Sequence, residues 1–535
     1  MNRSTSDVKI TLEIVIVVSV LVVSLGLRLV GLDAFVVNDE MRWTCRSIGF
    51  QEALLKGDWA DTFRTGHPGV ITTWLGTIFI PYEAADAEAR EACQITPDAS
   101  ELSESGDSPE ERTELMHRVR DLLFKARRGV ALFTWVSFLG IYLLTRHLWG
   151  VRVALLSLVL MAVDPFYLAL SRILHVDGAL TSTMTLSVLS LVAALRHRTE
   201  GAGRIGFLAL SGGMAGLAIL QKSPAMFLGP FAVLLVAVDV LRKGIDRRTF
   251  LGAVRDLAIW GLIAIVVYVA LWPTMWVQPV ETIRRILEMA LGYAAEGHSS
   301  GNYFIGRPAE DPGWLFYPVA TPFRLSPLAL IGLVAGGIWL LKRKGTADRQ
   351  YSTSDLLLYG AAFGAFMTLG DKMFDRYLVP IYPALEIVAA VGLWWIVDAV
   401  RDRLSGVGFK LFSAVPVTLL ILVTQLAITL PHYPHYLTYY NPLLGGIRQA
   451  KRVLLVGWGE GYEQAAAYLN EKPNAEELQV IMPAFPVFAP QFDGTTRSME
   501  KYSDWGSDYV MFYLSHVQRQ RYGELMDRYL YNPEA

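Results

Sequence analysis

The chain has 535 residues, of which 53% are hydrophobic and only 18% are charged. A soluble protein has about a quarter of its residues charged, so this composition favours an integral membrane protein. The formal net charge of -2 says little without the positions of the charges. The only two cysteines, Cys45 and Cys93, exclude a disulfide framework and a cysteine-based zinc site, and they leave open whether the two pair with each other.

The first apolar run, from Ile10 to Val30, is about 20 residues long and is followed by no Ala-x-Ala cleavage site. We therefore expect a retained membrane-spanning helix rather than a signal peptide. Further apolar runs lie at residues 130–147, 151–170, 178–195, 205–220, 225–241, 254–272, 323–341, 356–369, 377–397 and 411–430. Together they predict a mainly α-helical, polytopic membrane protein with about eleven transmembrane helices.

Basic residues gather in alternate loops of this arrangement, on the side that also carries Arg3 and Lys9. The positive-inside rule predicts that this side is cytoplasmic, which places the C-terminal region outside. The loops concerned contain Arg146 and Arg152; Arg196, Arg198 and Arg204; Arg242, Lys243, Arg247 and Arg248; Lys342, Arg343 and Lys344; and Arg401, Arg403 and Lys410.

The predicted outer loops are richer in functional side chains. The long first loop, residues 31–128, begins with the adjacent acids Asp39 and Glu40 in an aromatic and apolar setting. Its apolar stretch at residues 70–80 is too short to span and favours an interfacial or re-entrant helix. The acidic, Ser-rich stretch that follows, residues 83–114, predicts a mobile, solvated insert. Four other aromatic residues are expected in an interfacial belt: Trp272, Trp276, Trp314 and Tyr317.

Five motifs in this order resemble the polyprenyl-phosphate-dependent GT-C glycosyltransferases, and most of all the protein O-mannosyltransferase and lipid A aminoarabinose transferase-like branch. The resemblance covers roughly residues 10–430. Each motif alone is weak, but their order and their predicted side of the membrane make the set fairly specific. The motifs are NDE after the first span, HPGVITTW, SRILHVDGAL, GLAILQKSPA and DKMFDRYLVPIYPAL.

The resemblance implies that Asp39 is the catalytic base, because an inverting transfer needs a carboxylate to take the proton from the attacking hydroxyl. Glu40 would help to orient the acceptor or the sugar. The alternative is that the pair only caps a helix. Asp177 would bind a sugar hydroxyl or, with His175, a divalent cation, although spacing alone would favour a helix cap. No cofactor is certain, and metal dependence stays open.

Lys222 and Arg376 are the expected partners of the lipid phosphate, because cations at headgroup depth stabilise the charge that develops on the leaving group. Snorkelling at a helix end is the alternative for both residues and for Lys372. The resemblance adds further candidates for substrate binding: His67, Arg172, His298, Tyr303, Lys372 and Tyr377. Arg307, in the same loop as His298 and Tyr303, is a further candidate.

The last part of the chain, residues 431–535, predicts a small extracytoplasmic α/β domain after a transmembrane domain at residues 1–430. Strands are expected at residues 452–456, 478–482 and 508–514. The turn GWGEG lacks the full glycine spacing of a nucleotide site, so a packing or acceptor-recruiting role is favoured.

The predicted function is transfer of a sugar from a polyprenyl-phosphate donor to a hydroxyl of a lipid, glycan or protein acceptor at the outer membrane face. The partners are therefore the donor, the acceptor and membrane lipids, and no nucleic acid is expected. A flippase or transporter of lipid-linked sugars is the alternative, and it would need charges near mid-membrane. A non-catalytic scaffold is a third reading. Neither the donor sugar nor the acceptor can be read from the sequence.

Overall fold

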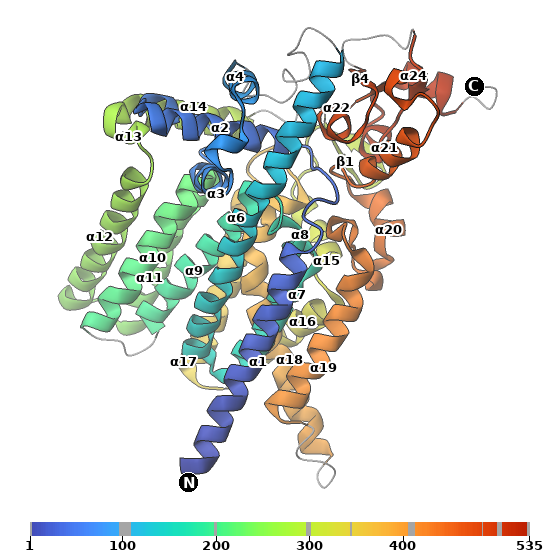
Figure 1. Cartoon of the computed structure of the whole chain (residues 1–535). Helices are drawn as coiled ribbons and strands as arrows, with labels where there is room; N and C mark the ends of the chain where they lie inside the picture. Colours follow the sequence, from blue (N-terminus) through green and yellow to red (C-terminus); the bar gives the residue numbers. More distant parts are fainter. Residues whose placement is uncertain are drawn as a thin grey trace.

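The structure, a computed structural model, describes residues 3–95, 109–196, 201–295, 301–342, 345–404, 412–483, 485–499 and 506–531. Long helices run side by side in a bundle, with the N-terminus at one end and the C-terminal segment at the other (Figure 1). The mainly helical fold class is confirmed. The long helices are α1 (Arg3–Leu29), α6 (Pro109–Trp149), α9 (Val176–Arg196), α10 (Ala202–Gln221), α11 (Leu228–Lys243), α12 (Arg247–Ala270), α17 (Ala347–Met367), α18 (Tyr382–Arg403) and α19 (Ala414–Thr429).

Eight segments in the described residues are long and apolar enough to cross a membrane. Shorter apolar helices are α3 (Val70–Phe79), α7 (Val151–Val163) and α16 (Pro327–Leu341). The count of about eleven crossings stays a prediction. The remaining helices are α2 (Glu40–Lys56), α4 (Ala87–Ile95), α8 (Pro165–Leu170), α13 (Thr274–Val277), α14 (Pro279–Ala295), α15 (Phe316–Arg324), α20 (Gly446–Val453), α21 (Tyr462–Asn470), α22 (Phe485–Phe488), α23 (Leu514–Gln518) and α24 (Gly523–Tyr529).

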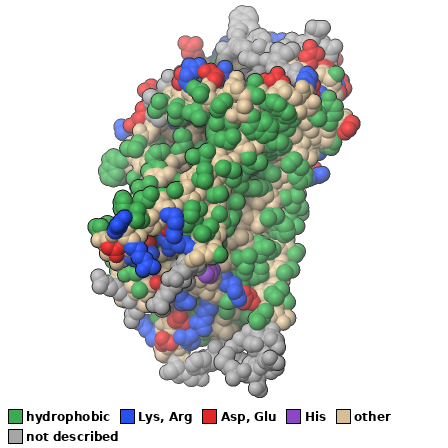
Figure 2. All heavy atoms as spheres, turned by 90° about the vertical axis from the view of Figure 1, so that its left-hand side faces the viewer, with side chains coloured by type: hydrophobic (Ala, Val, Ile, Leu, Met, Phe, Trp, Pro, Cys, Tyr) green, Lys and Arg blue, Asp and Glu red, His purple; other side chains and the backbone are tan. Residues whose placement is uncertain are grey.

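A broad apolar surface covers the middle of the bundle, and charged side chains gather above and below it (Figure 2). On α12, for example, Leu262 and Ile265 are each 63% exposed. Large aliphatic side chains exposed to water in such numbers would be unfavourable, whereas the same side chains facing lipid tails are not. The chain is therefore an integral membrane protein.

The first predicted loop ends in a long helical segment. Helix α6 begins at Pro109 and runs for 41 residues, about 60 Å at 1.5 Å per residue. It therefore projects past the apolar zone, and residues 109–128 of the predicted loop are helical. The predicted solvated insert also has structure at its start, because residues 87–95 form α4. Residues 96–108 lie outside the described part of the chain.

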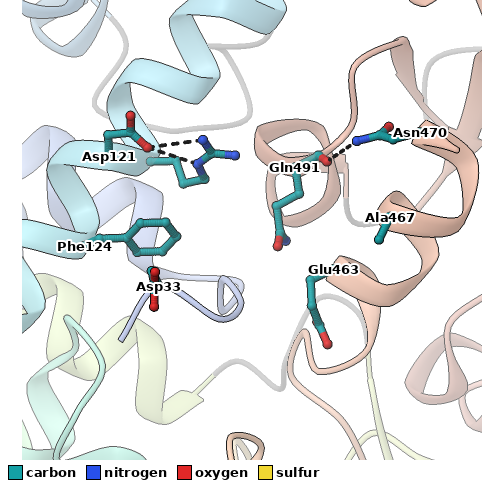
Figure 3. Close-up of a pocket in the computed structure, with 8 residues that line it drawn as sticks. Asp33, Asp121, Phe124, Glu463, Ala467, Asn470 and Gln491 are labelled. Atoms are coloured by element: carbon teal, nitrogen blue, oxygen red, sulfur yellow. Dashed lines mark hydrogen bonds and ion pairs between the residues drawn. The ribbon is translucent and has the colours of Figure 1, made fainter. Parts of the chain in front are cut away.

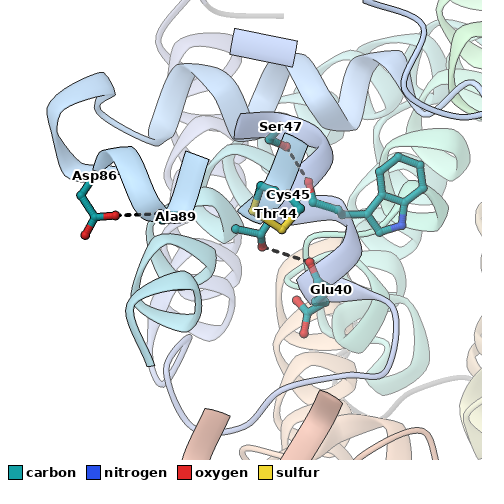
Figure 4. The surroundings of a disulfide bond; sticks show 8 residues. Glu40, Thr44, Cys45, Ser47, Asp86 and Ala89 are labelled. Atoms are coloured by element: carbon teal, nitrogen blue, oxygen red, sulfur yellow. Dashed lines mark hydrogen bonds between the residues drawn. A yellow bond between two sulfur atoms is a disulfide. The ribbon is translucent and has the colours of Figure 1, made fainter. Parts of the chain in front are cut away.

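A disulfide joins the two cysteines in this region. Cys45 on α2 and Cys93 on α4 have their Cα atoms 4.7 Å apart, and both are fully buried (Figure 4). The question that the sequence left open is thereby resolved in favour of pairing. The bridge fixes α4 against α2, the helix that begins directly after Asp39.

Replacing Cys93 by Ser is expected to lower the free energy of unfolding by about 2–4 kcal/mol, because the bridge closes a long loop of the unfolded chain. The two cysteines are 48 residues apart in sequence. Unfolding in detergent measures the loss. The double variant Cys45→Ser/Cys93→Ser serves as the control and should lose no more than the single one. Alkylation of two thiols in the unreduced protein would contradict the pairing.

Beyond the bundle, the end opposite the N-terminus carries short elements. Strands β1 (Asn302–Phe304) and β2 (Arg307–Ala309) form an antiparallel hairpin with Asn302 opposite Ala309. In the C-terminal segment, β3 (Gln479–Met482) lies between β4 (Thr495–Ser498) and β5 (Tyr509–Val510) in a parallel sheet. Val480 pairs with both Thr496 and Tyr509.

The C-terminal segment differs from the prediction at one strand. Residues 446–453 form α20, so a strand at 452–456 is wrong, and Leu454 makes only an isolated bridge to Phe304. The Gln518 side chain donates to the Lys451 and Leu454 carbonyls and accepts from the Val456 N–H. A side chain thus satisfies backbone groups that a sheet partner would otherwise have to satisfy.

Two of the four aromatics expected in the interfacial belt are buried. Trp272 is 0% exposed and stacks on Phe63, and Tyr317 is 2% exposed. Trp276 and Trp314, at 52% and 72%, are exposed as a belt requires. The sequence does not distinguish the two cases because burial here comes from segments far away in the chain.

Candidate active site

Asp39 stands directly before α2, at the end of the bundle opposite the N-terminus. Its backbone occupies the N-cap position, and its carbonyl accepts from the Trp43 N–H, but its side chain makes no capping hydrogen bond. The carboxylate is 26% exposed. Helix capping therefore does not explain the presence of a carboxylate at position 39, because this side chain makes no capping hydrogen bond to the helix.

The carboxylate of Asp39 faces an imidazole and a second carboxylate. His175 Nε2 lies 3.8 Å from Asp39 Oδ2, and His175 Nδ1 lies 3.2 Å from Asp177 Oδ2. Asp177, in the first turn of α9, is 1% exposed. The structure thus brings together three candidates from two predicted outer loops, with one imidazole between the two acids.

Two cations complete this cluster. Lys222 Nζ lies 3.0 Å from Asp177 Oδ1, and Arg376 Nε lies 3.8 Å from Asp177 Oδ2. Lys222 follows α10 in an extended conformation, and its ammonium lies 4.1 Å from the centre of the Tyr377 ring. Cations that merely snorkel to a helix end would point to water, whereas Lys222 is only 7% exposed. Five residues that the sequence placed on four different loops meet here.

Arg376 is held by its neighbour in sequence. It belongs to the short 3-10 helix Asp375–Ile381. Asp375 accepts from the Arg376 N–H at 2.7 Å and pairs with Arg324 Nε at 2.7 Å. Arg324 also donates to Tyr440 Oη. The backbone of Arg376 is therefore fixed, while its buried Nε makes no hydrogen bond within the described residues.

Glu40 is held in a buried ion pair. Its carboxylate is 0% exposed, accepts from Arg127 Nε at 2.7 Å, and pairs with the same guanidinium through its other oxygen. It also accepts the Val37 N–H at 2.9 Å and the Leu174 N–H at 2.8 Å. Glu40 therefore ties the loop before α2 to the loop before α9. This geometry suits a residue that holds two loops together better than one that orients the acceptor or sugar.

The electrostatics of the site are dominated by cations. Burial alone would raise the pKa of Asp39, but His175, Arg376, Arg42 and Arg46 outweigh it and lower that pKa below its ordinary value. Asp39 is therefore a carboxylate at neutral pH.

His67 and Lys372 lie in the same positive field. Burial, with the charges of Lys222 and Lys372, lowers the pKa of His67 to about 3, so this imidazole is neutral. Burial and the charges of Arg376 and Lys222 also lower the pKa of Lys372. Both residues therefore belong to the electrostatic environment of the cluster.

The other predicted residues lie in different settings. Arg172 donates to the carbonyls of Leu27, Val30 and Gly31, so it fastens the end of α1 instead of facing a substrate. Tyr303 lies on β1 and Arg307 is exposed on β2. His298 lies outside the described residues.

Asp177 and His175 do not fit a resident divalent cation. Both oxygens of Asp177 face the cations or imidazole described above, and a metal ion would be repelled by Lys222. No group of three or more His, Cys, Asp or Glu side chains is arranged to hold a metal ion in the described ranges.

A cavity of about 440 Å³ lies elsewhere, between the loop before α2, the upper part of α6 and α21 (Figure 3). Asp33, Asp121 and Glu463 contribute carboxylates, and Phe124 contributes a ring. None of the residues of the cluster lines it. The cavity is a separate feature of the same end of the molecule.

The fold and this cluster together define a polytopic membrane protein with carboxylates and cations grouped at one end of its bundle. Residues 113–272 match the model of the dolichyl-phosphate-mannose-protein mannosyltransferase family. The matched segment contains Arg127, His175, Asp177 and Lys222. The chain is thus similar to polyprenyl-phosphate-dependent GT-C glycosyltransferases, and the resemblance seen in the motifs is confirmed.

Solved structures with some similarity include three membrane enzymes. ArnT from Cupriavidus metallidurans bound to undecaprenyl phosphate is 15% identical (91% of this chain, 85% of that chain, TM-score 0.49). The archaeal oligosaccharyltransferase AglB from Archaeoglobus fulgidus, in complex with an inhibitory peptide and a dolichol-phosphate, is 14% identical (91% and 65%, 0.45). The S. cerevisiae protein O-mannosyltransferase Pmt1-Pmt2 complex bound to the sugar donor is 18% identical (51% and 34%, 0.36). No curated protein sequence matches this chain.

Three residues of the site escaped the sequence-based prediction. Arg42 lies 3.9 Å from Asp39, Arg46 stacks on the Trp43 ring, and Trp458 contacts both His175 and Arg376. The two arginines follow Asp39 by three and seven residues, so the helical period of α2 could have indicated them. For Trp458, the only signal was the GWGEG turn.

Proposed function

We propose that this protein transfers a sugar from a polyprenyl-phosphate donor to an acceptor hydroxyl at the extracytoplasmic membrane face, with inversion at the anomeric carbon. The observation that carries the proposal is the convergence of Asp39, His175, Asp177, Lys222 and Arg376. Such a site offers a base for the acceptor and cations for the leaving phosphate. Transferase activity agrees with the family match, which does not favour a flippase.

The reaction needs one proton transfer and one displacement. The acceptor hydroxyl loses its proton to the carboxylate of Asp39 while its oxygen forms a bond to the anomeric carbon. The bond from that carbon to the phosphate oxygen breaks on the opposite face, and its electron pair stays on the polyprenyl phosphate. Arg376 stabilises that added charge, because a guanidinium offers two parallel N–H donors to phosphate oxygens. Asp177 holds Lys222 and His175 in place.

Donor binding also activates the base. The field around Asp39 is positive before donor binding: five cations face the two carboxylates, namely Arg42, Arg46, Lys222, Lys372 and Arg376. An anionic donor is attracted to this field and then partly neutralises it. Part of the field that holds the pKa of Asp39 low is then removed, so that this pKa rises. Asp39 therefore becomes a better base only when the donor is bound.

The extracytoplasmic location is supported by two features. The basic loops at the N-terminal end favour a cytoplasmic position for that end. The disulfide at the opposite end is typical of an oxidising compartment. We therefore place the site, the disulfide and the C-terminal segment outside the cytoplasm.

The proposal is tested with purified protein and a panel of radiolabelled polyprenyl-phosphate hexoses and pentoses, with hydroxyl acceptors of lipid, glycan and peptide type. We expect turnover of at least one donor and release of polyprenyl phosphate, and a product of inverted anomeric configuration. Absence of turnover across the panel would reject the proposed function. A product with the configuration of the donor would reject inversion alone.

Arg376→Ala is expected to raise the KM for the donor about 10- to 100-fold, because a hydrogen bond to a charged group contributes about 1.5–3 kcal/mol. Steady-state kinetics at varied donor concentration measure this change. Arg448→Ala, an exposed arginine on α20, is the matched control and should leave the donor KM unchanged. An Arg376→Ala enzyme with the wild-type donor KM would remove Arg376 from the phosphate site.

A further inference from the structure

The glycine-rich loop of the C-terminal segment, residues 456–461, packs directly against the segment that carries Asp39. The Asn38 N–H donates to the Trp458 carbonyl at 3.2 Å. Gly459 has a φ of +132°, and a Cβ atom there would lie only 2.6 Å from the Val36 carbonyl oxygen. This position therefore requires glycine for both conformation and space. The close approach of the two backbones joins the end of the chain to its first outer loop.

The side chain of Trp458 reaches the cluster itself. The guanidinium carbon of Arg376 lies 4.1 Å from the centre of the indole, and the His175 ring meets the indole edge-on at 5.0 Å between centres. A guanidinium that stacks with its face on an aromatic ring keeps its N–H donors free in its own plane. Trp458 therefore orients Arg376 without using the donors that a phosphate needs.

The glycine-rich loop is also held by hydrogen bonds within the C-terminal segment. Glu460 accepts from the Trp458 N–H at 2.7 Å and from Tyr513 Oη at 3.0 Å. Tyr513 Oη also accepts from the Gly459 N–H at 3.0 Å. The backbone of the loop is thus fixed by groups within the C-terminal segment. A fixed loop can hold an arginine that projects from another part of the fold.

We propose that Trp458 is a positioning residue for the donor phosphate, and that the C-terminal segment completes the active site through this loop. This inference rests on the proposed function and extends it: the segment acts on the donor side, by orienting the guanidinium of Arg376. The sequence had instead favoured a packing or acceptor-recruiting role for the turn.

The test compares Trp458→Ala, Trp458→Phe and the control Trp314→Ala, which removes an exposed tryptophan, using the donor that the wild type turns over. We expect Trp458→Ala to raise the donor KM about 10-fold with a smaller change in kcat, because the cation–π contact that orients Arg376 is lost. Trp458→Phe, which keeps an aromatic face, should restore most of the affinity. The acceptor KM should not change.

A double-mutant cycle separates positioning from a structural role. In an Arg376→Ala background, Trp458→Ala should raise the donor KM no further, because the group that it orients is gone. Gly459→Ala, which displaces the loop without removing the indole, should raise the donor KM as Trp458→Ala does. Folding is judged by gel filtration in detergent. If Trp458→Ala does not fold, the donor KM values of Gly459→Ala and Trp458→Leu serve as the test instead.

The results that would overturn this inference differ from the results that would overturn the proposed function. A wild-type protein that is inactive on every donor overturns the proposed function. If the wild type is active but the Trp458 and Gly459 variants keep its donor KM, only the present inference is overturned. The same holds if these variants change only the acceptor KM, or if the effect of Trp458→Ala on the donor KM is additive with that of Arg376→Ala.

Discussion

Asp39→Asn is expected to lower kcat about 10²- to 10⁴-fold, the usual contribution of a positioned general base. Asparagine keeps the size of the side chain but cannot take a proton. The fold should survive, because the Asp39 side chain makes no capping hydrogen bond. Donor affinity should change little, since the phosphate partner Arg376 is untouched.

The measurement is single-turnover transfer from labelled donor at neutral pH, where the neighbouring cations keep the pKa of Asp39 low and its carboxylate ionised. Asp33→Asn, an exposed acid in the same loop, is the matched control and should retain wild-type rates. Full transfer by Asp39→Asn would keep the transferase class and remove Asp39 as its base.

The sequence pointed to the residues of the site because they lie in motifs that resemble a known family and at the ends of long apolar runs. His175 and Asp177 flank the start of α9, Lys222 follows α10, and Arg376 precedes α18. Once the helices are placed in a membrane, their ends share one layer, so residues at those ends are candidates to meet. This reasoning predicts that the residues lie at the same depth in the membrane. It does not predict which of them are neighbours in the plane of the membrane.

The contacts that the sequence could not indicate are those set by packing in that plane. The Glu40–Arg127 pair joins residues 87 positions apart, and Trp458 reaches Arg376 from 82 positions further along the chain. A periodic pattern predicts which face of a helix is buried but not which loop covers it. The prediction of a strand at 452–456 failed for the same reason. A side chain from a distant segment, Gln518, takes the place of a sheet partner there.

We expect the largest loss of stability when the Glu40–Arg127 ion pair is broken. Glu40→Gln leaves the Arg127 guanidinium, which is 2% exposed, without its counter-ion. Removing one partner of a buried pair costs about 3–5 kcal/mol, because the remaining charge stays desolvated. Unfolding in detergent measures this loss. Glu281→Gln, which removes one acid of the exposed pairs on α14, is the matched control and should change stability little.

Pairing can be separated from loss of a side chain by a second substitution. Glu40→Gln/Arg127→Met removes both charges, so its loss should be smaller than the sum of the two single losses by about 1–3 kcal/mol. Transfer activity should fall in all three variants, because the Leu174 N–H that Glu40 holds lies one residue before His175. Additive losses would mean that the two charges do not stabilise each other. A stable Glu40→Gln protein with no activity would instead favour the role that the sequence suggested for Glu40, which is to orient the acceptor or the sugar.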